Sequence, residues 1–258
     1  MIRRYDSLAA VADAIIPKHL DDHSRVGECG TAAECLEHAR HGDTRMVAAA
    51  EKLIDQLSLE FEVPNREVIS DLAGAWPSVP DFLAGHPDCM RRRAQVESEA
   101  SPIAIWVCIG VSWNVTPGQM RARGTAILAL VLALSRIRPI TLNVFAMSDI
   151  DGGSDDGCVV APINATPLDI ATAAWALTAP AAFRRLFYGM CRQLFRTEGL
   201  FPDAYHRGST AYLRDLLIRL GGDPDKDLII DAARGSDKLI DDSIAWVKEQ
   251  AARYGVAA

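Results

Sequence analysis

The second part of the chain, residues 101–258, alternates short continuous apolar runs with longer stretches of helical spacing. Continuous apolar runs of this length are typical of strands buried on both faces. The predicted strands are 103–109, 140–145, 158–163 and 228–232. The predicted helices are 118–136, 167–195 with a break at Pro180, 210–220, and a last helix capped by Ser236 that ends at residue 254. Strands that alternate with helices predict an α/β fold: a doubly wound, mainly parallel sheet with helices on both faces. One pair is an exception, because the turn-rich segment DGGSDDG at 151–157 separates 140–145 from 158–163 and predicts a hairpin.

The first hundred residues show helices and loops. Apolar residues recur at helical spacing over 7–16 and 44–57, and the segment AGAWPSVP at 73–80 has the composition of a loop. The middle of the helix at 118–136, AILALVLAL, is apolar on all sides and must be covered by further elements. We therefore expect residues 1–100 to form a helical N-terminal extension packed on a main domain of residues 101–258.

Charge and composition narrow the range of partners. The chain has 258 residues, 24% of them charged, and a net charge of -7. A general nucleic-acid binder needs clustered Lys and Arg, and the densest basic run, MRRR at 90–93, is short and is expected to be an exposed helix end. No signal peptide or membrane-length apolar segment is found, so a cytoplasmic protein that binds neither membrane nor nucleic acid is expected. Six scattered cysteines indicate buried thiols, without a disulfide framework.

Polar residues gather where the predicted strands end. Ser112, Trp113 and Asn114 follow the first strand, Thr166 follows the third, and Asp231 ends the fourth. Ligands of open α/β sheets bind beyond the carboxyl ends of the strands, so these residues form the candidate binding loops. Trp113 would suit a partner surface or the core.

This arrangement resembles the von Willebrand factor A family, over about residues 101 to 255. That family has a metal-ion-dependent adhesion site in which the first strand ends in D-x-S-x-S, a Thr precedes a later helix, and an Asp ends a further strand. Ser112, Thr166 and Asp231 match the middle Ser, the Thr and the Asp, and ATPLDIA at 165–171 is similar to the helix start of the family. The resemblance implies a doubly wound fold and a protein-binding function.

The candidate metal site is degenerate in this sequence. Gly110 stands where the family has its first Asp, and Asn114 stands where it has its last Ser. Mg²⁺ prefers oxygen ligands that include one or two carboxylates, and here Asp231 alone keeps one. The resemblance therefore implies Ser112, Asn114, Thr166 and Asp231 as the metal ligands of a site with low affinity for Mg²⁺ or none, and no other cofactor. The alternative is that these residues cap helices and fix loops.

A second resemblance concerns DLAGAWPSVPDFLAGHPDCMRRR at 71–93 and RGTAILALVLAL at 123–134, which look like segments of uncharacterised bacteriophage-encoded proteins. It implies a location in the host cytoplasm or the virion. Taken together, the two resemblances favour a non-enzymatic protein-interaction module, a phage accessory or assembly protein with a protein partner. An accessory subunit of a MoxR-type AAA ATPase, an enzyme of unrecognised type, and a homo-oligomer stay open.

Two chemical alternatives have weaker support. GVSWN at 110–114 partly matches the G-x-S-x-G turn of α/β-hydrolases, but it lacks the second Gly, and His206 is the sole histidine after Ser112. The histidines and cysteines between 19 and 41 match no standard zinc spacing, which favours exposed polar residues on short helices.

Overall fold

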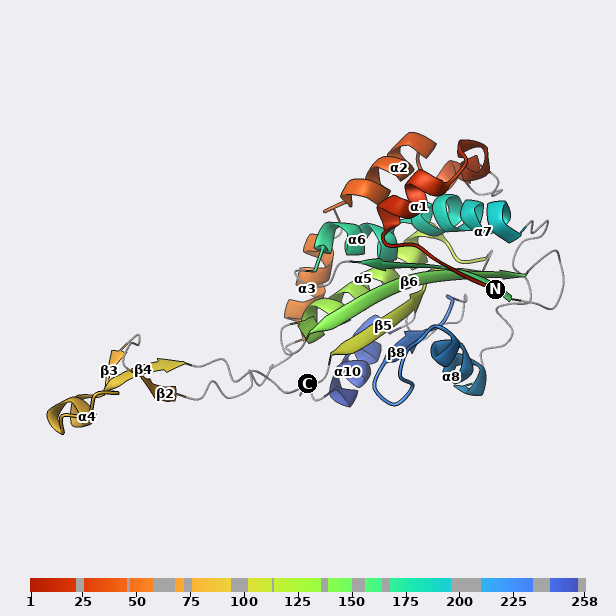
Figure 1. The fold of residues 1–258 in the computed structure, drawn as a ribbon. Coiled ribbons are helices and arrows are strands. Elements are labelled where there is room, and N and C mark those ends of the chain that lie inside the picture. The colour runs from red at the N-terminus through yellow and green to blue at the C-terminus, as the bar shows by residue number, and fades with distance from the viewer. Residues whose placement is uncertain are drawn as a thin grey trace.

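The computed structural model describes residues 1–21, 26–45, 47–57, 68–71, 76–93, 102–112, 114–135, 139–149, 156–163, 168–195, 210–233 and 242–254. Its main feature is a mixed five-stranded sheet with the order β1-β7-β6-β5-β8. The strands are β1 (Ile2–Arg4), β5 (Ile103–Cys108), β6 (Ile140–Asp149), β7 (Asp156–Ile163) and β8 (Leu228–Ile230). All neighbours are parallel except β6 and β7, which form an antiparallel pair. The predicted single sheet and the predicted hairpin are confirmed, and the sheet is mixed (Figure 1).

Strand β5 occupies the interior of this sheet, between β6 and β8. Its side chains alternate between two faces, as the pleat of a strand requires. Ile105 and Val107 belong to the larger hydrophobic core, whereas Trp106 and Cys108 belong to a second core on the other face. A strand with two buried faces needs apolar residues at every position, which explains the continuous run in the sequence.

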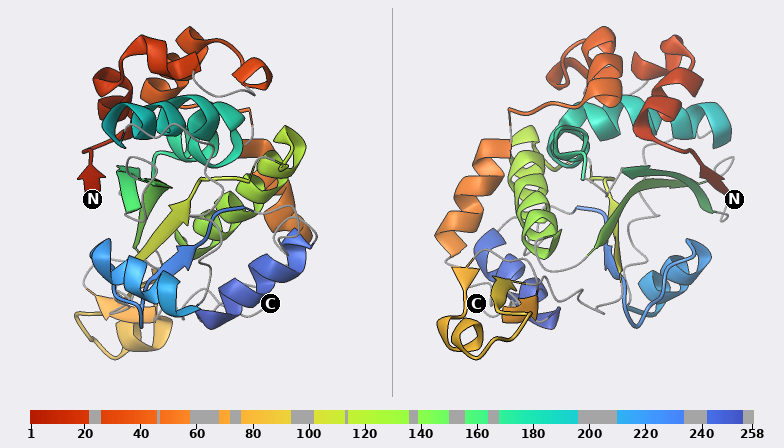
Figure 2. Two further views of the ribbon diagram at one scale, coloured as in Figure 1. Left: turned by 90° about the vertical axis from the view of Figure 1, so that its right-hand side faces the viewer. Right: turned by 60° about the vertical axis from the view of Figure 1, so that its left-hand side comes forward.

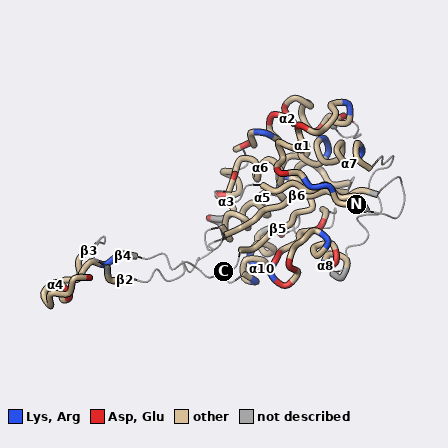
Figure 3. The backbone as a smooth tube through the Cα atoms, viewed as in Figure 1, with Lys and Arg blue, Asp and Glu red and all other residues tan. Residues whose placement is uncertain are grey.

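Helices cover both faces of the sheet. The larger core contains α5 (Pro117–Ser135), α6 (Ile170–Thr178) and α10 (Ser243–Arg253), and the second core contains α8 (Thr210–Arg219). Figure 2 shows α5 and α10 on one side of the sheet and α8 on the other. Charged positions lie on peripheral helices such as α2 and α8 (Figure 3). The last helix, α10, is capped by Asp242, and the predicted cap Ser236 lies outside the described residues.

Helix α5 is buried along most of its length. It begins with a capping box in which Thr116 Oγ1 accepts from the Gln119 amide and Gln119 Oε1 accepts from the Thr116 amide, at 3.2 and 2.9 Å. Its residues 126–131 are fully buried, and it contacts α3 (Val47–Leu57), α6 and α10. The α6 contact is so close that a Cβ at Gly124 would lie 2.0 Å from the carbonyl oxygen of Leu177.

The N-terminal residues contribute to the same core. Strand β1 pairs with β7, and α1 (Leu8–Ala14) is capped by Ser7. Helix α2 (Ala32–His41) ends at Gly42, whose positive φ of 74° lets the chain turn against α6. There the Asp43 amide donates to the carbonyl oxygen of Ala171 at 3.0 Å. The expectation of a purely helical extension was wrong, because β1 belongs to the main sheet. The domain border at residue 100 stays a prediction.

A second, smaller sheet also departs from that expectation. Strands β2 (Val68–Asp71), β4 (Met90–Arg93) and β3 (Trp76–Pro77) form an antiparallel sheet in that order, with a short helix α4 (Val79–Leu83) between β3 and β4. In Figure 1 this unit lies apart from the main sheet. The basic run at 90–93 is therefore a strand, and the expectation of a helix end was wrong. Within the segment 73–80, residues 76–77 and 79–80 belong to β3 and α4, and 73–75 lie outside the described residues.

The break predicted at Pro180 is confirmed, and the chain continues beyond it as a π-helix, η3 (Ala182–Phe187), followed by α7 (Tyr188–Phe195). Two consecutive arginines of η3 are buried. Arg184 pairs with Glu28 at 2.6 Å, and Arg185 pairs with Asp21 and donates to the carbonyl oxygen of Gly30 at 2.6 Å. These contacts hold Asp21, Glu28 and Gly30 against the core, since buried guanidinium groups need such partners.

We predict that Gly124→Ala lowers the free energy of unfolding by roughly 3 kcal/mol, because the new methyl group meets backbone atoms of α6 that cannot move aside. The matched control is Gly118→Ala in the first turn of the same helix, where the nearest atom would be 3.8 Å away. That variant should gain up to about 1 kcal/mol from helix propensity. Urea denaturation measures both. Equal effects of the two substitutions would contradict the close α5–α6 contact.

Candidate functional site

Two loops meet at the carboxyl edge of the main sheet. The first connects β5 to α5, and the second follows β8. A parallel bridge joins Val111 to Ala233, the Ser112 amide donates to the carbonyl oxygen of Ala233, and the Ala233 amide donates to that of Gly110, both at 2.9 Å. The parallel pairing of β5 with β8 thus continues beyond both strands and fixes the loops side by side.

The predicted binding residues lie on these loops as far as the structure describes them. Ser112 is half-buried, and its carbonyl oxygen accepts from the Val115 amide at 3.1 Å in a tight turn. Asn114 is exposed. Asp231 is half-buried, and its Oδ1 accepts from the Ala232 amide at 2.7 Å. Trp113 and Thr166 lie outside the described residues, so the convergence of the full set stays a prediction.

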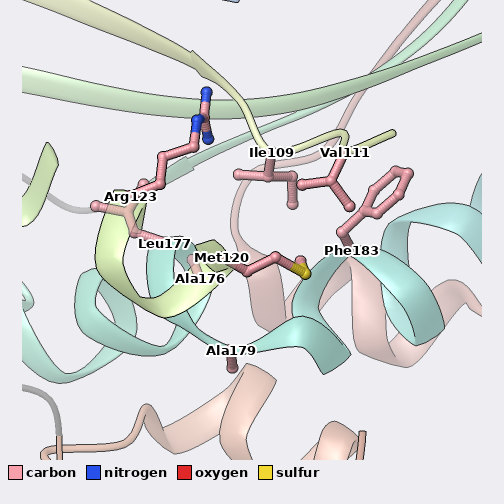
Figure 4. Close-up of a pocket in the computed structure, with 8 residues that line it drawn as sticks. All are labelled: Ile109, Val111, Met120, Arg123, Ala176, Leu177, Ala179 and Phe183. Atoms are coloured by element: carbon pink, nitrogen blue, oxygen red, sulfur yellow. The ribbon is translucent and has the colours of Figure 1, made fainter. Parts of the chain in front are cut away.

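Arg123 is a residue of this region that the sequence interpretation did not identify. It extends from α5 toward the strands (Figure 4), and 3% of it is exposed. One of its terminal nitrogens donates to the carbonyl oxygens of Cys108, at 3.3 Å, and of Asp231. Arg123 thus ties together the carboxyl ends of β5 and β8. The sequence places two arginines, Arg121 and Arg123, ahead of the apolar middle of this helix and does not show that Arg123 is the buried one.

A small cavity lies beside Arg123, between β5, α5 and the α6–η3 connection (Figure 4). Apart from Arg123 its lining is apolar: Ile109, Val111, Met120, Ala176, Leu177, Ala179 and Phe183. Such a lining offers few hydrogen-bonding groups to a polar ligand.

Cys108 is the thiol nearest to the loops along the chain, at the end of β5. Burial, together with the negative charge of Asp231, raises its pKa to about 12. A thiol with such a pKa is protonated at neutral pH and is a poor nucleophile. Cys108 is therefore a packing residue of the second core.

The β5–α5 loop is also linked to the N-terminal residues through the π-helix. Arg184, which pairs with Glu28, donates from its other terminal nitrogen to the carbonyl oxygen of Val115 at 2.5 Å. Only 1% of the Arg184 side chain is exposed. This contact supports the β5–α5 loop from the core side. The position of the loop therefore depends on Arg184 and Glu28, which are far away in the sequence.

Among the described residues no group of three or more His, Cys, Asp and Glu side chains is placed to hold a metal ion. Cys29 and Cys35 are buried, which corrects the expectation that the histidines and cysteines between 19 and 41 are all exposed. Burial raises the pKa of the Cys35 thiol to about 12. In the described part of the chain, no helix is long and apolar enough to cross a membrane.

Comparison with known proteins gives one match. The whole chain, residues 1–258, matches the family model described as "Domain of unknown function (DUF7192)". The chain belongs to this family. No curated protein and no solved structure matches it. The DUF7192 assignment brings no activity with it, so the function has to be argued from the loops at the sheet edge.

We predict that the wild-type protein shows no saturable Mg²⁺ binding with a dissociation constant below about 1 mM in a calorimetric titration. Gly110 supplies no carboxylate, and the buried guanidinium of Arg123 opposes a nearby cation. Gly110→Asp should strengthen binding, and adding Asp231→Asn should abolish the gain. Stoichiometric, tight binding by the wild type that is lost in Asp231→Asn would show a working metal centre.

Proposed function

We propose that this DUF7192 protein is a protein-interaction module with a doubly wound, von Willebrand A-like fold, and that it binds its partner through the loops at the carboxyl edge of the sheet. The strand order β7-β6-β5-β8, with an antiparallel β6–β7 hairpin and helices on both faces, supports this comparison. In that family the corresponding loops carry the ligand site.

The observation that carries the proposal is the bridge between Val111 and Ala233. It makes a single surface out of two loops from distant parts of the sequence, and Asn114 is exposed on that surface. The buried side chains of Arg123 and Arg184 support this surface through hydrogen bonds to the carbonyl oxygens of Asp231 and Val115. A surface fixed in advance loses little conformational entropy on binding, which favours recognition of a protein partner. Service to a MoxR-type ATPase, or to the assembly of a phage, is a special case of this function.

The proposal predicts where a partner can be cross-linked. A photoreactive amino acid in place of Asn114 should give a specific cross-linked product with the partner in native cells. The same probe in place of Thr141, an exposed residue at the amino end of β6, should give none. The product should also be competed away by unlabelled protein.

Equal products from both positions, or a product that unlabelled protein does not compete, would contradict a specific binding face at the carboxyl edge. Catalytic turnover by the purified protein that disappears in Ser112→Ala would favour an enzyme.

A further inference from the structure

A second candidate binding surface lies at the β8 end of the sheet, away from the helix-covered interior. A solvent-open cleft of about 230 Å³ runs between β8 and α10. One wall is formed by residues 228–231, and the other by Trp246, Gln250 and Arg253. These three residues are four and three positions apart, so they share one face of α10.

Strand β8 is the edge strand of the described sheet, on the side away from β5. It is the last strand in the sheet order, and among the described strands it pairs with β5 alone. An edge strand presents a row of backbone N–H and C=O groups that can pair with another chain. Proteins blunt such edges with charged residues, yet β8 has the sequence Leu-Ile-Ile. The three residues of this short edge strand therefore carry no charge that would oppose strand addition.

The chemistry of the cleft restricts what can bind there. Trp246 is half-buried and offers an apolar surface, whereas Arg253 is exposed and carries a positive charge. The Arg253 guanidinium donates to Gln250 Oε1 at 3.0 Å, which orients it on the helix face. An extended peptide directs alternate side chains to opposite faces, so it can pair with β8 while every second side chain enters the cleft.

We propose that the β8–α10 cleft binds an extended peptide segment of a partner protein, which adds a strand to the edge of β8 and places an acidic side chain against Arg253. Backbone hydrogen bonds to β8 supply affinity, Trp246 contacts an apolar side chain of the peptide, and Arg253 selects for the carboxylate. This surface shares Asp231 with the proposed binding face at the β5–α5 loop, but Trp246 and Arg253 lie outside that face. The two binding proposals are tested by separate experiments, so one can be overturned while the other is supported.

The test uses the full chain and two labelled octapeptides of alternating Val and Thr, one with Glu and one with Lys at a terminal position. Fluorescence anisotropy should show that the Glu peptide binds at least about tenfold more tightly than the Lys peptide. Arg253→Glu should reverse this preference, whereas Lys248→Glu, a change on the same helix outside the cleft lining, should leave it unchanged. Asn114→Ala should have no effect, which separates this surface from the loop face.

Backbone pairing has its own control. A Glu peptide N-methylated at alternate residues cannot donate to the edge of β8 and should bind at least about tenfold more weakly. In β8, the alternate amides that face away from β5 should exchange more slowly when the unmodified Glu peptide is bound. The proposal is overturned if the methylated peptide binds equally well, if exchange at β8 is unchanged, or if Arg253→Glu keeps the preference for Glu. It is also overturned if sedimentation experiments show that a second copy of the chain occupies the cleft.

Discussion

The burial of α5 on all sides is the constraint on which the rest of this structure depends. A helix that is apolar around its whole circumference cannot lie on the surface of a sheet, because the outward half would remain in water. Here the sheet covers one side, and α3, α6 and α10 cover the others. These helices come from the beginning, the middle and the end of the chain. The hydrophobic effect on one helix therefore joins residues 47–57 to residues 243–253 in a common core.

The same helix determines the geometry of the candidate binding face. The β5–α5 loop has to reach the first turn of α5, whose position is fixed by the contact at Gly124. Arg123 projects from α5 to the carbonyl groups at the ends of β5 and β8, and Arg184 reaches the loop from η3. The loops thus have support from two buried arginines. Arg123 donates to backbone oxygen atoms, and Arg184 donates to a backbone oxygen atom and to the Glu28 carboxylate. Such support fixes loop shape better than apolar contacts alone, since hydrogen bonds are directional.

The sequence was informative where burial sets the pattern of residues. The continuous apolar runs gave β5, β6 and β7, and the apolar middle of α5 required covering helices. The rule that ligand loops follow strand ends located Ser112 and Asp231 on loops that do meet. Strands that form only by pairing with distant segments could not be predicted. Ile2–Arg4 has no strand pattern of its own and becomes β1 through its hydrogen bonds to β7. Likewise, the basic run at 90–93 becomes a strand because β2 and β3 pair with it.

Buried arginines were missed for a related reason. A single sequence marks Arg123 and Arg184 as charged and therefore exposed, and their burial depends on oxygen atoms supplied by residues up to 156 positions away. No local pattern contains that information.

The most direct test of this account is native-state hydrogen exchange across a series of urea concentrations. If the burial of α5 joins the N-terminal helices to the sheet, the slowest amides of α3, such as Ala50, and those of α5, such as Leu130, exchange through one common unfolding event. Their opening free energies and urea dependences then coincide. An α3 that opens at much lower free energy, while α5 and β5 stay protected, would show that the core of the sheet stands without it.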